Sequence, residues 1–473
     1  MKMYSVRRLT TFAALIAMPL TACDEGTTEP PVTPQPGVAT ISTDITANRT
    51  LYADTTYTIS GFVHVANGAT LTIEPGTKIV GDLDVLGSSL FVLRGARIVA
   101  NGTAAAPIVF SSARPAGSRQ PGDWGGLIIV GNGLINRSGT VQVEGTGTVT
   151  GTNPGTNYAV TYSGGTSNAD NSGSLQYVRV EFAGYAPSDA NELNSFTFAA
   201  VGSGTVVNNL QSLAGLDDSF EWFGGAVDGR YLVSYESGDD HFDMSEGYSG
   251  RLQYLIAMQT RVLTPRAGAG SVSGDPMGIE NDGCNGAGCD LGHSSTPLTV
   301  PVVANFTLIG RGDANTISTG GDIGMTLRRG TGGHYVNGVI GRFPRAAISI
   351  RDAGTQTRIA DGNLTINNVL ASDVGALYQA GQQAGVDTAV NNIHTTAATS
   401  ASLFTALPAA PASGAQIDWT PAAGAAIRTG GLTTFTGNLL TRSGTFITPT
   451  AYLGAADPNG AKWWQGWTNY SIN

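Results

Sequence analysis

Two acidic blocks in the middle of the chain carry the residues best suited to bind a cation. Each block holds three carboxylates at matching positions: Asp217, Asp218 and Glu221 in the first block, and Asp239, Asp240 and Asp243 in the second. All three pairs of matching positions are 22 residues apart, and only the pair of Glu221 and Asp243 differs in residue type. Carboxylate oxygens are the ligands that hard cations such as Ca²⁺ prefer. We therefore predict that these six residues, called the acidic column below, bind Ca²⁺.

The spacing of the two blocks also predicts how they are placed. Twenty-two residues suit one coil of a parallel β-solenoid, in which each coil stacks on the one before. Matching carboxylates would then lie about 4.8 Å apart, the distance between neighbouring strands. Like charges at that distance repel, so the column needs a cation, a basic partner or raised pKa values at neutral pH. Glu280 and Asp282 would complete an oxygen cage if their Gly-flanked segment approaches the column.

The aromatic residues of the blocks follow the same repeat only in part. Phe220 and Phe242 recur with the carboxylates, as expected of an aromatic stack inside the coils. Trp222, Phe223 and Tyr248 are out of phase with this repeat. Two interpretations of these three residues stay open, a place in the core and an exposed platform for a sugar.

Cys284 and Cys289 are five residues apart and are expected to form a disulfide. This pairing suits an oxidising compartment. Asp290 and His293 lie close by in the sequence and raise zinc binding as an alternative, although structural zinc sites use four ligands that are mostly Cys and His.

The N-terminus indicates where the protein acts. Lys2, Arg7 and Arg8 precede a short apolar stretch at residues 9–20, which is typical of a signal peptide. The sequence Leu-Thr-Ala-Cys at residues 20–23 resembles the lipobox of bacterial lipoproteins, in which the Cys becomes the lipidated N-terminus. We expect lipidation at Cys23 and attachment to the bacterial envelope, at the outer membrane or cell surface. An ordinary secreted protein with an incidental Cys23 is the alternative, and the acidic residues directly after Cys23 leave the leaflet open.

The rest of the chain is predicted to be one all-β domain. Gly accounts for 65 of the 473 residues and charged residues for 13%, which suits short strands joined by tight turns. We expect a signal peptide at 1–22, a Pro/Thr-rich tether at 23–42 and a single parallel β-helix at 43–473. Loops are expected to project at 136–171, 186–192 and 264–298, and residues 370–407 to form a short helical excursion. Trp463, Trp464 and Trp467 are expected to form a short cap over the last coil.

Several motifs resemble one family of proteins. They are VHVANGATLTIEPGTKI, GDWGG, the paired blocks DDSFEWFGG and GDDHFDMSEG, and the ending WWQGWTNY. In these motifs the chain resembles bacterial secreted and lipid-anchored parallel β-helix proteins, a group without an established activity. The resemblance implies a right-handed β-helix in an extracellular or cell-surface setting. Many relatives carry a C-terminal sorting domain, whereas this chain ends soon after Trp467, which favours the lipid anchor.

Two functions are compatible with these features. The first is a lipid-anchored envelope protein that acts in surface interaction or structure, with Ca²⁺ stabilising its acidic coils and a polysaccharide or envelope protein as partner. The second is a Ca²⁺-dependent polysaccharide lyase or glycoside hydrolase that uses the same carboxylates. A lyase also needs a base, for which Arg230, His241 and Arg251 are candidates without a motif that fixes their roles.

The charge of the chain excludes one class of partner. Loss of the three basic residues of the signal peptide moves the formal net charge from −10 to −13. Such an acidic protein is repelled by phosphate backbones. Nucleic acid is therefore not expected as a partner.

Overall fold

The computed structural model describes residues 37–147, 158–188, 191–312, 320–381, 386–411 and 413–472. All of them belong to one compact unit, Pro36–Asn473. The expected signal peptide and Cys23 lie outside the described residues. Among the described residues, no helix is both long and apolar enough to cross a bilayer.

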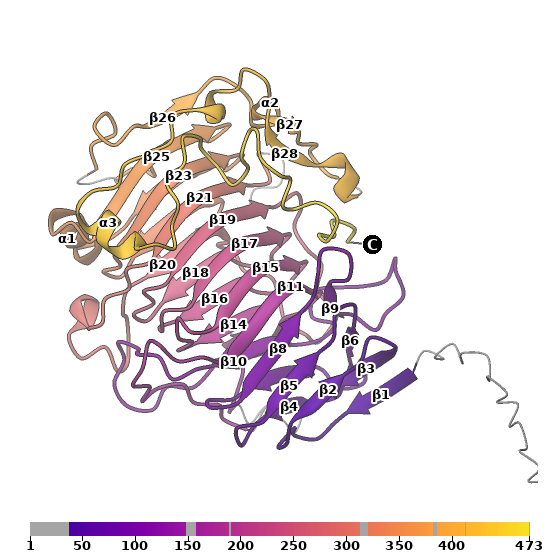
Figure 1. Cartoon of the computed structure of the whole chain (residues 1–473). Helices are drawn as coiled ribbons and strands as arrows, with labels where there is room; N and C mark the ends of the chain where they lie inside the picture. Colours follow the sequence, from indigo (N-terminus) through magenta and orange to yellow (C-terminus); the bar gives the residue numbers. More distant parts are fainter. Residues whose placement is uncertain are drawn as a thin grey trace, which may run out of the picture. The chain divides into compact units, whose positions relative to one another are not determined.

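Two parallel sheets, here named A and B, form the molecule (Figure 1). Among the described residues, sheet A contains fifteen strands: β1 (Gly37–Ile41), β2 (Arg49–Leu51), β3 (Thr55–Ile59), β5 (Thr70–Ile73), β6 (Lys78–Gly81), β8 (Arg97–Asn101), β9 (Ile108–Ser111), β11 (Gly173–Glu181), β15 (Val206–Leu213), β17 (Asp228–Tyr235), β19 (Arg251–Met258), β21 (Val302–Ile309), β23 (Gly333–Gly341), β25 (Leu364–Ser372) and β26 (Ile393–Thr396). In the same described part of the chain, sheet B contains nine strands: β4 (Phe62–Val65), β7 (Ser89–Val92), β10 (Gly126–Val130), β14 (Phe196–Ala199), β16 (Phe220–Phe223), β18 (Phe242–Ser245), β20 (Met277–Asp282), β22 (Ile323–Arg328) and β24 (Ala346–Ile350). From β14 to β25 the chain alternates between the sheets, so each coil adds one strand to each of them. The fold is a right-handed parallel β-helix, as predicted.

Short elements lie outside these sheets. Two small antiparallel pairs are formed by β12 (Tyr185–Ser188) with β13 (Asn191–Leu193), and by β27 (Phe404–Ala406) with β28 (Asp418–Pro421). The α-helices are α1 (Ala353–Ala360), α2 (Ser400–Leu403) and α3 (Gly437–Ser443), and the 3-10 helices are η2 (Gly292–Ser294), η4 (Gly414–Gln416) and η5 (Ala426–Arg428).

A column of residues in the left-handed conformation bends the long strands of sheet A. One such residue interrupts each strand of sheet A from β11 to β25, with φ between 48° and 66°: Tyr177, Asn209, Tyr231, Tyr254, Asn305, Asn337 and Asn368. Four of the seven are Asn, a residue that tolerates this conformation better than most. The bend divides each of these strands into a first and a second half, and each half has an inner and an outer side.

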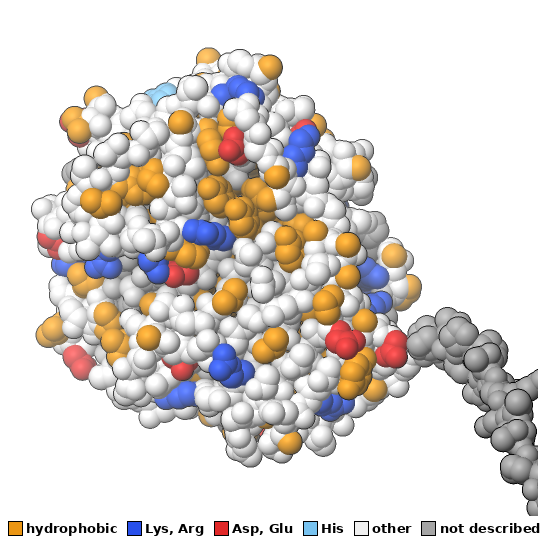
Figure 2. All heavy atoms as spheres, viewed as in Figure 1, with side chains coloured by type: hydrophobic (Ala, Val, Ile, Leu, Met, Phe, Trp, Pro, Cys, Tyr) orange, Lys and Arg blue, Asp and Glu red, His pale blue; other side chains and the backbone are white. Residues whose placement is uncertain are grey.

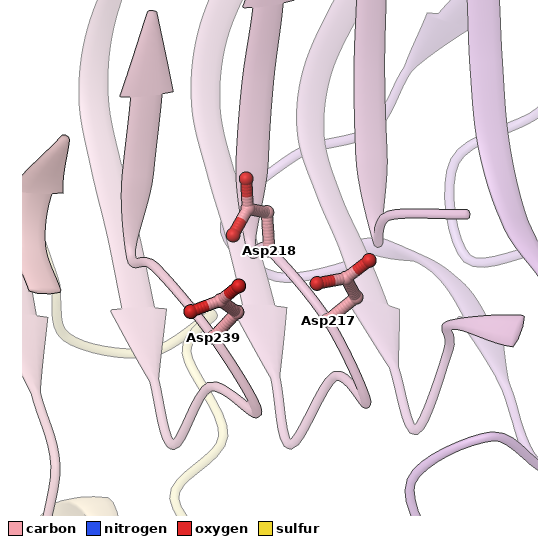
Figure 3. Close-up of side chains that lie close together, drawn as sticks. All are labelled: Asp217, Asp218 and Asp239. Carbon is pink, nitrogen blue, oxygen red and sulfur yellow. The ribbon is translucent and has the colours of Figure 1, made fainter. Parts of the chain in front are cut away.

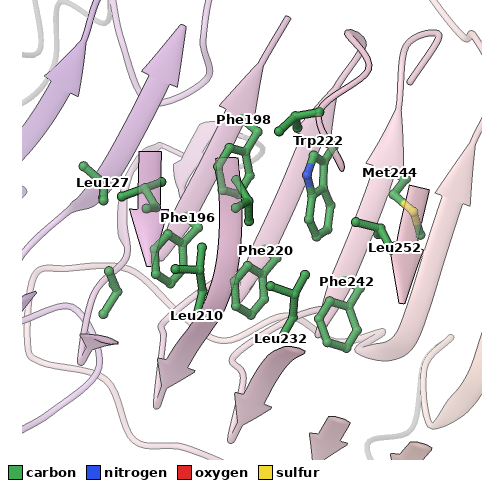
Figure 4. Close-up of a cluster of buried hydrophobic side chains, with 14 of the residues drawn as sticks. Leu127, Phe196, Phe198, Leu210, Phe220, Trp222, Leu232, Phe242, Met244 and Leu252 are labelled. Atoms are coloured by element: carbon green, nitrogen blue, oxygen red, sulfur yellow. The ribbon is translucent and has the colours of Figure 1, made fainter. Parts of the chain in front are cut away.

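The interior of the coils is filled by stacked side chains (Figure 4). The rings of Phe196 and Phe220 stack with centroids 4.9 Å apart, and those of Phe220 and Phe242 are 5.5 Å apart. The predicted aromatic stack of Phe220 and Phe242 is therefore confirmed. Trp222 and Tyr248 are also buried in this core and stack on each other, so the sugar platform is wrong for these two residues.

The C-terminal segment packs against the side of the helix instead of closing its end. Trp464, Trp467 and Tyr470 pack with Tyr235 and Met258 of sheet A. The ring of Trp467 meets Tyr177 of β11 edge to face, and the end of the chain lies beside β11 (Figure 1). The predicted cap over the last coil is therefore wrong. Beyond the bend, the strands of sheet A carry apolar side chains on their outer side. The C-terminal segment packs on these side chains and shields them from water.

Three further expectations differ from the structure. Strand β1 begins at Gly37, inside the segment expected to be a tether, because residues 37–41 pair in parallel with β3. The segment 264–298 is not only a loop, since β20 lies within it and pairs with β18 and β22. The segment 370–407 contains β26 and β27, and its only described helix is α2, with four residues.

Candidate functional site

The two acidic blocks stack at neighbouring corners of the helix, as their spacing predicts. Asp217 and Asp218 precede β16, and Asp239 and Asp240 precede β18. The Asp240 backbone N–H donates to Asp218 Oδ1 over 2.8 Å. Farther along the strands, Glu221 is paired directly with Asp243. The predicted register of the acidic column is therefore confirmed.

The carboxylates form two linked groups that fit a metal ion. In the first group, oxygens of Asp217, Asp218 and Asp239 lie within 4.8 Å of one another (Figure 3). In the second, the same holds for Asp218, Asp240 and Asp243. Ca²⁺ binds oxygens at about 2.3–2.6 Å, so oxygens up to about 5 Å apart can share one ion. The geometry of both groups therefore suits a hard cation, and Asp218 belongs to both.

Burial makes these carboxylates costly to ionise. Asp218 and Asp240 are 6% and 4% exposed, and Asp217, Asp239 and Asp243 are half-buried. Burial, followed by repulsion from neighbouring carboxylates, raises the pKa values of Asp217, Asp218, Glu221, Asp240 and Asp243 well above their ordinary values. Burial raises the pKa of Asp239 to about 7. The acidic column therefore retains its protons to higher pH than ordinary carboxyl groups do, unless cations replace them.

Hydrogen bonds at the corners satisfy some of the carboxylate oxygens but not all. Asp240 Oδ1 accepts the backbone N–H of Met277 over 2.5 Å, so Asp218 and Asp240 both link neighbouring coils. Asp243 Oδ1 is buried and has no hydrogen-bond partner among the described residues. A buried, unpartnered carboxylate oxygen is unfavourable unless a ligand satisfies it. Asp243, which carries this unpartnered oxygen, belongs to the second metal-compatible group.

An acidic pocket of about 220 Å³ opens over the outer side of sheet B. Its carboxylates come from six residues: Glu144, Glu221, Asp243, Glu246, Glu280 and Asp282. The other lining residues are Arg137, Phe223, Ser245, Gly283, Asn285 and Arg329. Ser245 is only 8% exposed, and its hydroxyl has no partner among the described residues. Phe223 also lines this pocket, where its ring lies beside the ring of Tyr162.

Glu280 and Asp282 reach the column as the oxygen-cage hypothesis required. Glu280 is paired with Asp243 across β18 and β20. However, both carboxylates also bind arginines, because Arg328 contacts Glu280 and Asp282 and Arg329 contacts Asp282. Arg328 of β22 and the adjacent Arg329 therefore neutralise part of the negative charge of these carboxylates.

Glu144 is the functional candidate that the sequence did not indicate. It lies in the segment between β10 and β11, and the Asn194 side chain donates to both Glu144 and Glu221. Burial raises the pKa of Glu144 to about 7. Glu144 is outside the 22-residue repeat in a Gly- and Thr-rich stretch, so no sequence signal points to it.

The three candidates for a catalytic base do not line the acidic pocket. Arg251 forms an ion pair with Asp228, and the Arg230 guanidinium lies 4.0 Å from the ring of Phe446. His241 is buried and hydrogen-bonded to Ser234 over 2.5 Å, and burial lowers its pKa to about 3. The roles considered for Arg230, His241 and Arg251 therefore receive no support from their positions. The arginines of the pocket are Arg137 and Arg329.

The disulfide lies at the edge of the acidic pocket. Cys284 and Cys289 are bonded, as predicted, which removes the zinc alternative with Asp290 and His293. The loop that they close accepts hydrogen bonds from Arg137 at the carbonyl of Ala287. Arg137 in turn forms an ion pair with Glu246. The disulfide loop therefore supports one wall of the pocket.

A family model and a solved structure resemble this chain. A family model described as a pectate-lyase-like β-helix domain matches residues 43–422. The crystal structure of pectate lyase Pel9A is similar, with 14% sequence identity and a TM-score of 0.41 over 83% of this chain and 88% of that chain. No curated protein matches the chain. The chain belongs to the family of pectate-lyase-like β-helix domains.

Proposed function

We propose that this protein is a lipid-anchored β-helix of the bacterial cell envelope that binds Ca²⁺ at the acidic column and a polysaccharide in the acidic pocket. The observation that carries the metal site is the pair of linked carboxylate groups, one of which includes Asp243, a residue with an unpartnered buried oxygen. Bound Ca²⁺ would neutralise these carboxylates and offer coordination positions to the oxygens of an acidic sugar. Membership of a pectate-lyase-like family supports a polysaccharide as the ligand.

The acidic column and the acidic pocket have separate tasks in this proposal, and they share Glu221 and Asp243. Asp217, Asp218, Asp239, Asp240 and Asp243 would hold the ions. Glu221 and Glu280 continue the row of carboxylates across sheet B, because each is paired with Asp243 in the register. Ser245 and Asn285 can exchange hydrogen bonds with sugar hydroxyls from the pocket wall.

Titration calorimetry tests the metal site directly. Ca²⁺ is titrated into the chain from Asp24 onward and into the double variant Asp217→Asn, Asp239→Asn. The matched control is the double variant Asp54→Asn, Asp457→Asn. It also removes two carboxylates, but both are exposed and far from the acidic column in the sequence. We expect two Ca²⁺ per chain in the parent chain and the control, and one in the double variant Asp217→Asn, Asp239→Asn, because Asp218, Asp240 and Asp243 of the second group are unchanged. Absence of Ca²⁺ binding in the parent chain would refute the proposal.

A second candidate function is cleavage of the polysaccharide. Glu144 favours it, because a carboxyl group with a pKa of about 7 in a pocket is suited to act as a general acid. For a lyase, Arg137 and Arg329 lie beside the acids, but both are engaged in ion pairs. Burial alone would lower the pKa of Arg328, but the carboxylates of Asp282 and Glu280 raise it above its ordinary value, which disfavours its use as a base.

Product analysis separates the two cleavage reactions. Oligogalacturonate is incubated with the Ca²⁺-loaded protein, and new reducing ends and unsaturated uronate are measured. Hydrolysis produces reducing ends alone, whereas a lyase also produces the unsaturated sugar. Activity that is lost in Glu144→Gln would identify Glu144 as the acid, and absence of both products would leave binding as the function.

A further inference from the structure

A second surface with the chemistry of a sugar site lies on the outer side of sheet A. Val207 and Leu252 point into the core, so their neighbours Asn208 and Gln253 point outward. The register aligns five outward polar side chains across neighbouring strands: Asn101, Gln176, Asn208, Arg230 and Gln253. We call this set the amide row. Its members repeat about every 4.8 Å along the helix.

The C-terminal segment covers only one end of the amide row. Gln253 is fully buried and exchanges two hydrogen bonds with the backbone of Thr448. The cover ends at Phe446, whose ring contacts the guanidinium groups of Arg230 and Arg251. The four remaining members of the row are half-buried: Arg230, which contacts Phe446, and Asn208, Gln176 and Asn101, which follow on the neighbouring strands.

A pocket of about 310 Å³ opens at this boundary. Its principal lining residues are Val206, Asn208, Asp228, Arg230, Tyr231 and Phe446. Phe446 and Tyr231 provide apolar walls. The ring of Tyr231 is held between Tyr254, at 5.0 Å, and Trp463, at 5.1 Å. Rigid aromatic walls of this kind suit the C–H face of a sugar ring.

The charges around the pocket favour an anionic ligand. The Asp228 carboxylate is neutralised by Arg251 through two hydrogen bonds of 2.8 and 2.5 Å. Arg230 meets no carboxylate among the described residues and donates only to the carbonyl of Phe446. Arg230 Nε and Asn208 Oδ1 are both buried without a hydrogen-bond partner in the described part of the chain. The pocket therefore has one uncompensated positive charge in an otherwise acidic protein.

We propose that this pocket and the open part of the amide row bind an acidic oligosaccharide without Ca²⁺. Arg230 would bind the sugar carboxylate, Tyr231 and Phe446 would contact the ring, and the amides of Asn208 and Gln176 would bind hydroxyls of successive units. The site is independent of the proposed function, because none of its residues lines the acidic pocket.

Calorimetry in the presence of a chelator tests this site alone. Tetragalacturonate is titrated into the chain from Asp24 onward, which contains the whole compact unit, in excess EGTA. Val206→Trp fills the pocket from a side chain that is 46% exposed, and Val390→Trp is its control at a position that is 79% exposed. Arg230→Gln removes the charge, and the carboxyl-reduced tetramer removes the charge of the ligand.

The expected result is binding in EGTA that weakens about tenfold or more in Val206→Trp, in Arg230→Gln and with the reduced tetramer. Val390→Trp and the double variant Asp217→Asn, Asp239→Asn should bind as the parent chain does. Binding that requires Ca²⁺ and is lost in that double variant would place the ligand in the acidic pocket and overturn the inference. The inference is also overturned if tetramers of galacturonate, guluronate and glucuronate all fail to bind in EGTA.

Discussion

Asp218 is the residue on which both metal-compatible groups depend. It shares one group with Asp217 and Asp239 and the other with Asp240 and Asp243. Its Oδ1 also accepts the backbone N–H of Asp240, so it links two coils as well. Asp218 thus links two coils and also belongs to a geometry that fits metal ions. A substitution that keeps the oxygen accepting the Asp240 N–H can separate these two properties.

The first prediction concerns stoichiometry. Asp218→Asn retains an oxygen that can accept the Asp240 N–H but removes a charge from both groups, whereas Asp217→Asn affects one group only. We expect two Ca²⁺ per chain in the parent protein, one in Asp217→Asn and none in Asp218→Asn, as measured by calorimetry. Equal stoichiometry in both variants would show that the two groups do not act as separate sites.

The second prediction concerns pH. The pKa values of Asp239 and Glu144 are raised to about 7, so between about pH 4 and pH 7 the folded state binds more protons than the unfolded state. Without metal, the free energy of unfolding therefore falls as pH rises through this window. We expect the melting temperature in EGTA to be lower at pH 8 than at pH 5, and Ca²⁺ to raise it more at pH 8.

The double variant Asp217→Asn, Asp239→Asn provides the comparison for this experiment. It has fewer carboxylates to deprotonate, so its melting temperature should depend less on pH between 5 and 8. An identical pH dependence in variant and parent would show that other groups determine the stability in this range.

At the level of elements, stacked strands replace the single core of a globular domain. Each coil buries its inward side chains against the coils before and after it, as Phe220 does between Phe196 and Phe242. Outward side chains line the candidate pockets on both sheets or, on sheet A, contact the C-terminal segment. The same alternation along the strand therefore creates both the core and the two candidate sites.

The third prediction concerns this aromatic stack. Phe220 is fully buried, so Phe220→Ala should lower the free energy of unfolding by about 3–5 kcal/mol because it leaves a cavity between two coils. Urea denaturation measures the effect. Leu440→Ala, at a side chain that is 55% exposed in α3, should change the free energy by no more than about 0.5 kcal/mol. Similar losses in both variants would contradict the central role of the stack.

At the scale of the whole molecule, the surface is acidic and sparsely charged. The chain has 35 acidic and 25 basic residues, and on the face shown in Figure 2 the charged side chains lie singly or in small groups among uncharged surface. Many of the described arginines are engaged in ion pairs with carboxylates of neighbouring coils, as Arg328 is. An acidic ligand would therefore need a local attraction, either Ca²⁺ on sheet B or Arg230 on sheet A.

The fourth prediction concerns membrane attachment through Cys23. Acyl chains on this residue would anchor the protein, so Cys23→Ala should move it from the membrane fraction to the soluble fraction and abolish labelling with radioactive palmitate. Asp24→Ala is the control that retains the lipidated residue. Surface biotinylation of intact cells then reports the leaflet. Labelling that persists in Cys23→Ala would refute lipidation at this position.

The repeat and the stacking that it imposes were predictable from the order of the residues alone. Identical spacing of the two acidic blocks is enough to predict parallel stacking, the register of Glu221 on Asp243 and the buried Phe220 and Phe242, because the period of the chain is also the period of the coil. The disulfide of Cys284 with Cys289 was predictable from their proximity in the sequence. These features are local or periodic, and periodicity can be read from one sequence.

The non-repeating segments that lie against the coils could be identified only in the folded chain. Glu144 meets Glu221 through a segment that has no period, Trp467 lies on β11 instead of on the last coil, and Phe446 closes a pocket beside Arg230. Such contacts join residues far apart in the chain and depend on the path of irregular backbone. No spacing in the sequence encodes that path, so both candidate pockets required the folded structure.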